Sequence, residues 1–136
     1  MKIRKAQVGI EYLLIMGFAV AVIIGMLGVA FYYSGSVNDQ IKFSQIDSCA
    51  RKIISASESV FYSGTPSKAT LSCYLPDNVR QIEILENNLI FTFQTSSGIS
   101  KTSFSSKVPI SGNLPSFFGL KSITVRAEQN FTVISS

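Results

Sequence analysis

A nearly uninterrupted apolar run close to the N-terminus limits what this chain can fold into. It spans Val8 to Tyr33, 26 residues in which Glu11 is the only charged side chain. As a helix the run would be roughly 39 Å long, and a bilayer's hydrocarbon core is about 30 Å thick. The apolar part of an ordinary secretory signal has only about 7 to 15 residues. The sequence therefore predicts a helix that can cross a membrane and that stays with the protein.

Basic residues are placed unevenly along the chain. Three of the twelve, Lys2, Arg4 and Lys5, precede the apolar run, and the remainder carries nine basic and eight acidic residues. A basic flank beside an apolar span is typical of its cytoplasmic end, so we expect a single-pass membrane precursor with a cytoplasmic N-terminus. The nearly neutral remainder argues against nucleic acid as a partner, because such binding needs many Lys and Arg contacts to phosphate.

A different pattern follows the apolar run over residues 34–64. Apolar residues recur there mostly at steps of three and four, with charged residues between them, which predicts an amphipathic helix. The Ser34-Gly35-Ser36 step is where a bend or the edge of the lipid would fall, and Gly64 and Pro66 predict an end near Ser63. The apolar positions are Val37, Ile41, Phe43, Ile46, Ala50, Ile53, Val60 and Phe61.

Residues 69–136 have a period of two and predict a β-rich head. Alternating strands are expected over residues 81–84 and 89–93, joined by a hairpin turn at Asn87-Asn88, since Asn tolerates positive φ. Ser96-Ser97-Gly98 predicts a second turn, and residues 99–108 an exposed edge strand. Residues 111–119 predict a loop. The last one or two strands are expected at Ile123, Val125 and Ala127, and at Phe131 and Val133.

These patterns together predict an α+β fold. A small antiparallel sheet needs a cover for its apolar face, and the amphipathic helix is the only cover available. Cys49 on that helix and Cys73 on the first strand lack the spacing and histidine partners of a metal site. Outside the cell they predict a disulfide, and closing its 25-residue loop would contribute roughly 3.5 kcal/mol. The alternative is two unrelated buried thiols.

A family resemblance lies at the start of the apolar run. The segment Lys5-Ala6-Gln7-Val8-Gly9-Ile10-Glu11-Tyr12-Leu13-Leu14 resembles the class III signal peptide of archaeal type IV pilin-like proteins. The resemblance implies that a leader of residues 1–6 is cut off between Ala6 and Gln7, which leaves a hydrophobic helix over residues 7–33. Ala6 and Gly9 stand where many members have Gly and Ser.

Glu11 is the residue to which the resemblance gives a role. It implies that Glu11 pairs with the new N-terminal amine of Gln7 in a neighbouring subunit during assembly. A carboxylate within lipid is costly unless it is paired, and such pairing would turn two isolated charges into one site. The alternative is that Glu11 lies at the headgroup level and stays hydrated.

Four small residues lie on one side of the expected apolar helix. Gly17, Ala21, Gly25 and Gly28 follow at steps of four, four and three, the small-xxx-small pattern that allows close helix approach. Ordinary glycine enrichment in membrane helices is the alternative.

Asn130-Phe131-Thr132 is an N-glycosylation sequon. Its three-residue pattern also arises by chance. The resemblance favours glycosylation of Asn130, because archaeal surface filaments often carry glycans.

The sequence contains no constellation that predicts catalysis. Histidine is absent, the acidic residues of the head are scattered, and no glycine-rich phosphate loop precedes a helix. We therefore expect no enzyme and no cofactor, but a structural subunit of an extracellular filament for surface attachment.

The resemblance implies four kinds of partner: copies of the chain itself, a prepilin peptidase, an assembly ATPase and a membrane platform protein. Two other functions stay open. The chain could be an archaellin, the subunit of a swimming filament, or a membrane-tethered extracellular binding module that never polymerises.

Overall fold

The chain forms a long helix followed by strands. In the computed structural model, the backbone is described for residues 2–136 and the side chains for residues 8–136. The predicted α+β fold class is confirmed. The described elements are α1 (Lys2–Ser63), β1 (Lys68–Leu75), β2 (Val79–Leu85), β3 (Asn88–Thr95), β4 (Gly98–Ser105), β5 (Ile110–Gly112), β6 (Gly119–Ala127) and β7 (Thr132–Ser135).

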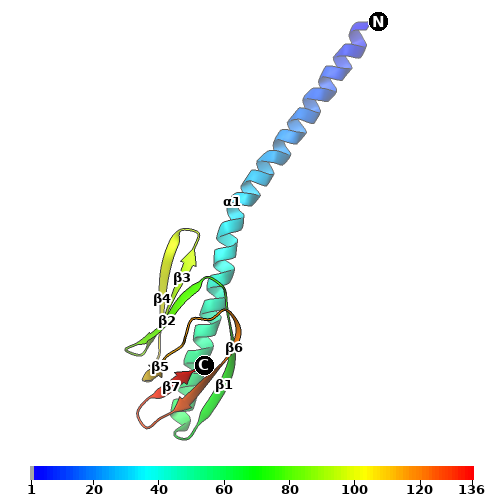
Figure 1. The fold of residues 1–136 in the computed structure, drawn as a ribbon. Coiled ribbons are helices and arrows are strands. Elements are labelled where there is room, and N and C mark those ends of the chain that lie inside the picture. Colours follow the sequence, from blue (N-terminus) through cyan, green and yellow to red (C-terminus); the bar gives the residue numbers. More distant parts are fainter. Residues whose placement is uncertain (1) are drawn as a thin grey trace. The chain divides into compact units, whose positions relative to one another are not determined.

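Two compact units divide the chain, Met1–Asn38 and Asp39–Ser136. The first contains only the N-terminal part of α1. The second, called the head below, contains the rest of α1 together with the described strands (Figure 1).

The end of α1 follows from two residues with special backbone properties. Gly64 adopts a φ of 74°, the left-handed conformation that commonly terminates helices and that costs glycine little. Its N–H donates to the carbonyl of Phe61 at 3.1 Å, which satisfies one of the free carbonyls of the last turn. Pro66 follows and lacks the N–H that a continued helix needs. The helix ends at Ser63, where these signals predict it.

The strands of the head form two sheets, which differs from the single antiparallel sheet expected. One sheet has the order β1-β6-β7-β5 and the other β2-β3-β4. The pair β5 and β7 is parallel, with Ile110 opposite Thr132. A parallel pair requires a crossover connection between its strands. Here the connection contains β6, which lies between β5 and β7 in the sequence and pairs antiparallel with β7.

The first hairpin turn lies one residue earlier than expected. Strand β3 begins at Asn88, which pairs with Leu85. The two turn residues are Glu86 and Asn87, with φ values of 47° and 67°, as in the two-residue turns that match the twist of a hairpin. This register buries Leu89 and Phe91 completely. The second turn, at Ser96 and Ser97, lies where it was predicted.

The core of the head lies between α1 and both sheets. The amphipathic half of α1 contributes one buried stripe, and each sheet contributes alternate residues of its strands, as the period of two requires. The members are Ile46, Cys49, Ala50, Ile53 and Val60 from α1, and among others Leu75, Ile123 and Val125 from one sheet and Leu89, Phe91 and Phe93 from the other.

The last strand expected, at Phe131 and Val133, is β7, which begins at Thr132. Thr132 and Ile134 are buried, whereas Phe131 precedes the strand and is 40% exposed. The buried Thr132 hydroxyl has a partner, because it donates to the carbonyl of Ser57 on α1 at 3.5 Å. A hydrogen-bonded threonine is tolerated in a core where an unpaired one is costly.

Candidate functional site

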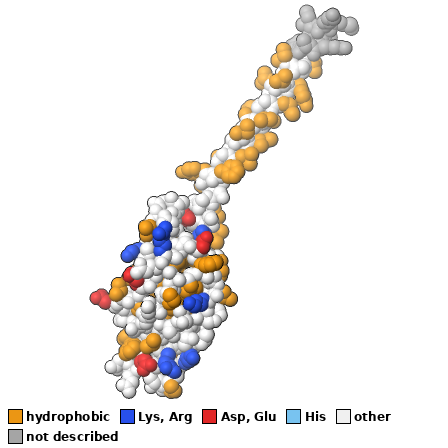
Figure 2. Space-filling model, in the orientation of Figure 1, with side chains coloured by type: hydrophobic (Ala, Val, Ile, Leu, Met, Phe, Trp, Pro, Cys, Tyr) orange, Lys and Arg blue, Asp and Glu red, His pale blue; other side chains and the backbone are white. Residues whose placement is uncertain are grey.

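The apolar segment of α1 is the most unusual surface of the described chain. Every residue from Val8 to Asn38 is exposed. Figure 2 shows hydrophobic side chains along the visible face of this segment, and most charged side chains on the head. The helix is long and apolar enough to cross a membrane. Exposed apolar surface on this scale marks a membrane or protein interaction site.

Glu11 lies within this apolar surface. It is exposed, and none of its side-chain atoms forms a hydrogen bond or ion pair with the residues from Val8 onward. Among the described residues, the Glu11 carboxylate therefore has no partner within the chain and contacts only what surrounds the helix. The predicted cleavage site, Ala6 and Gln7, lies outside the described side chains, and so does the predicted pairing of Gln7 with Glu11.

The small residues of the apolar segment leave open space around the helix. At about 100° per residue, Gly17, Ala21, Gly25 and Gly28 lie within one narrow arc. A Cβ placed on any of the three glycines meets no atom within 4 Å. Packing within the chain therefore does not require glycine at these positions.

Three aromatic residues lie at the C-terminal end of the apolar segment. Phe31, Tyr32 and Tyr33 are 77%, 82% and 61% exposed. The rings of Tyr32 and Tyr33 meet edge to face, with 5.7 Å between their centroids. The signal that could have identified them is their position, since Tyr is enriched where a span meets water.

The predicted disulfide between Cys49 and Cys73 is present. It joins α1 to β1 within the head, with 5.4 Å between the two Cα atoms, and both residues are buried. The covering helix is thus covalently attached to the sheet that it covers.

Two polar contacts hold the start of the head's helix to the loops between strands. Asp39 accepts hydrogen bonds from the backbone N–H of Ser96, at 2.9 Å, and from its hydroxyl. These bonds lower the pKa of Asp39 below its ordinary value. Lys42 forms an ion pair with Asp77 at 2.8 Å, and its hydrogen bond and charge lower the pKa of Asp77.

Open grooves lie on the head surface beside α1. Their linings combine serines and apolar residues with the charged side chains of Arg51, Lys52 and Glu58. Among the described residues, no group of three or more His, Cys, Asp and Glu side chains could hold a metal ion.

Comparisons with known proteins identify no relative. No family model matches the sequence, and neither a curated protein nor a solved structure is significantly similar to it. The function is therefore inferred from the apolar helix and the carboxylate of Glu11.

Asn130, the predicted glycosylation site, is exposed between β6 and β7. The asparagine is therefore accessible in the folded head, whereas the threonine of its sequon, Thr132, is fully buried.

Proposed function

We propose that this chain is a structural subunit of an extracellular type IV pilus-like filament that serves surface attachment. The observation that carries the proposal is the apolar segment of α1, which is exposed along its whole described length and contains one carboxylate. In the proposal, lipid covers this segment in the precursor, and the helices of other copies cover it in the filament.

The amount of apolar surface supports a polymer. Burying one large apolar side chain contributes about 1.5–3 kcal/mol relative to water, and most residues between Val8 and Tyr33 are of this kind. Once the helix leaves the lipid, water exposure is therefore strongly unfavourable, and association with equivalent helices is the available alternative. The small residues at Gly17, Gly25 and Gly28 leave room for such close approach.

Glu11 supports a filament over a plain membrane tether. A tether needs only an apolar span and has no use for a carboxylate beside it, whereas a filament core without headgroups or water requires a counter-charge for Glu11. In the proposal, a prepilin peptidase cleaves between Ala6 and Gln7, and the resulting amine of Gln7 pairs with Glu11 of a neighbouring subunit. The pair needs both partners, because one isolated charge in an apolar core is costly.

The remaining partners follow from the same proposal. An assembly ATPase and a membrane platform protein move the subunit out of the bilayer, and the heads coat the outside of the filament. The disulfide of the head fits an oxidising location outside the cell. Glycosylation of the exposed Asn130 belongs to this proposal, since an outward-facing loop is accessible to a glycan.

Substitution of Glu11 tests the proposal. We expect Glu11→Ala to insert into membranes normally and to form no filaments, because the neighbouring amine loses its counter-charge. Glu128→Ala is the matched control, since it removes a carboxylate from an exposed loop of the head. Electron microscopy of cells provides the readout. Normal filaments from Glu11→Ala would contradict the assigned role.

A further inference from the structure

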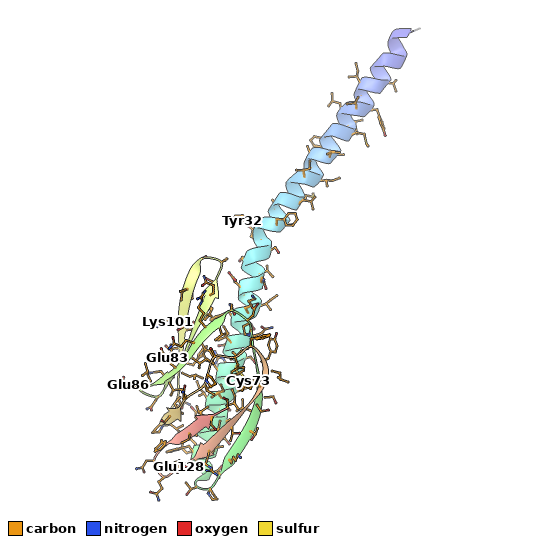
Figure 3. The ribbon with its side chains drawn as sticks, in the orientation of Figure 1. Tyr32, Cys73, Glu83, Glu86, Lys101 and Glu128 are labelled. Carbon is orange, nitrogen blue, oxygen red and sulfur yellow. A yellow bond between two sulfur atoms is a disulfide. The ribbon has the colours of Figure 1, made fainter. Side chains whose placement is uncertain are left out.

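Tyrosines lie at the C-terminal end of the apolar segment of α1 and close to its N-terminal end. Among the described residues of the unit that ends at Asn38, tyrosine occurs only at Tyr12, Tyr32 and Tyr33. Tyr12 is 64% exposed and Tyr32 82%, and Figure 3 shows Tyr32 on α1. The phenol ring is apolar and its hydroxyl is polar, which favours the level where hydrocarbon meets headgroups.

The distance between these tyrosines matches one bilayer. Tyr12 and Tyr32 are 20 residues apart in an unbroken helix, which corresponds to roughly 30 Å along its axis at 1.5 Å per residue. The hydrocarbon core of a typical bilayer is also about 30 Å thick. The residues between them include no charged side chain. A helix close to the membrane normal therefore brings both tyrosines to an interface at once.

A polar or charged residue adjoins the tyrosines on the outer side of each position. On the C-terminal side, Ser34, Gly35 and Ser36 follow the aromatic residues. On the N-terminal side, Glu11 directly precedes Tyr12, and its carboxylate is exposed. Hydration of Glu11 at the headgroup level avoids the cost that a carboxylate has within hydrocarbon.

From these relationships we infer a fixed register of α1 in a phospholipid bilayer. Tyr32 and Tyr33 lie at the headgroup level on the side of the head, Tyr12 and Glu11 lie at the opposite headgroup level, and Val22 lies at the midplane. This rests on the membrane-spanning precursor of the proposed function and adds where that precursor sits. Glu11 then enters apolar surroundings only when the helix leaves the bilayer, so its need for a counter-charge arises at assembly.

The absence of tryptophan from the chain permits a direct test. Three single variants, Tyr12→Trp, Val22→Trp and Tyr32→Trp, each introduce one fluorescent probe. Val22 is the matched control, because it lies 10 residues from either tyrosine. Each full-length variant is reconstituted at low protein-to-lipid ratio in phosphatidylcholine vesicles whose acyl chains carry bromine either near the headgroup or near the chain end.

The register predicts opposite quenching at the ends and the middle. For the probes at 12 and 32, the ratio of shallow to deep quenching should exceed one, and for the probe at 22 it should fall below one. Deeper quenching of either end probe than of the middle probe would overturn the register. Lack of quenching at all three positions would also overturn it, because lipid would then not contact the helix. The readout requires no filament, so it is independent of whether the chain polymerises.

Discussion

The carboxylate of Asp39, near the start of the head's helix, accepts two hydrogen bonds from Ser96 in the turn between β3 and β4. The hydroxyl and the backbone N–H both stabilise the ionised form, which lowers the pKa of Asp39. The Lys42 ammonium lowers the pKa of Asp77 in the same way. These two contacts link α1 to loops that are far away in the sequence.

The lowered pKa values of Asp39 and Asp77 predict that the folded head loses stability in acid. Because their pKa values are lower in the folded than in the unfolded chain, their stabilisation is present above the ordinary Asp pKa and is lost as the pH falls through the folded values. The wild type should therefore melt at a higher temperature than Asp39→Asn at neutral pH, and the two melting curves should converge in strong acid. Both groups are solvent-accessible, so we expect a small effect. Thermal unfolding followed by circular dichroism at a series of pH values measures it.

Ser96→Ala is the matched variant for this prediction. It removes the hydroxyl donor and keeps the backbone N–H donor, so its effect should be smaller than that of Asp39→Asn. In the double variant Asp39→Asn/Ser96→Ala, the loss of melting temperature should be smaller than the sum of the losses in the two single variants, since the two side chains share one interaction. A constant difference between wild type and Asp39→Asn at every pH would contradict the account.

The disulfide predicts a second, larger effect on stability. The double variant Cys49→Ala/Cys73→Ala lacks this cross-link, so its unfolded chain has a higher conformational entropy. Its free energy of unfolding should therefore fall by about 3.5 kcal/mol. Urea unfolding of the full chain in detergent measures this change. Reduced wild type should unfold like the double variant. Reaction of both cysteines with a thiol reagent in the unfolded but unreduced protein would contradict the disulfide.

A third prediction concerns the small residues of the apolar segment. A Cβ at Gly25 meets no atom of the chain within 4 Å, and leucine is a better helix former than glycine by about 1 kcal/mol. Gly25→Leu should therefore leave folding and membrane insertion intact, while its bulk keeps neighbouring helices apart and abolishes filaments. Ile24→Leu, which conserves side-chain volume on the adjacent position, is the control.

Electron microscopy of cells that express each variant measures the number of filaments. Equal numbers from Gly25→Leu and Ile24→Leu would mean that this helix face makes no close contact between subunits.

Local features of the sequence were sufficient to predict the helix and its attachment. The apolar run, the amphipathic steps and the Gly64 stop signal act within a few residues, and each predicts α1 correctly. The pairing of Cys49 with Cys73 was also predictable, because the chain has no other cysteine.

Long-range pairing was not predictable from the same patterns. Strand β5 has three residues, too few to show a period, and its parallel partner β7 lies some 20 residues further along the chain. Thr132 is buried with a hydrogen bond to Ser57, a contact across 75 residues, which the alternation of apolar residues does not reveal. The contact of Asp39 with Ser96 spans 57 residues and likewise leaves no local signal.

The candidate site was partly predictable for a related reason. Glu11 and the glycines are visible as exceptions within an apolar run, so the sequence identifies them directly. The exposure of the aromatic residues at the end of the run becomes evident only from the structure, in which they are not part of the core of the head.

N-terminal sequencing of the main protein in filaments sheared from the cell surface tests the central claim most directly. The account predicts that this chain forms the filaments and that its first residue is Gln7. A chain that keeps Met1 and occurs only in the membrane fraction, with no filament containing it, would contradict the account.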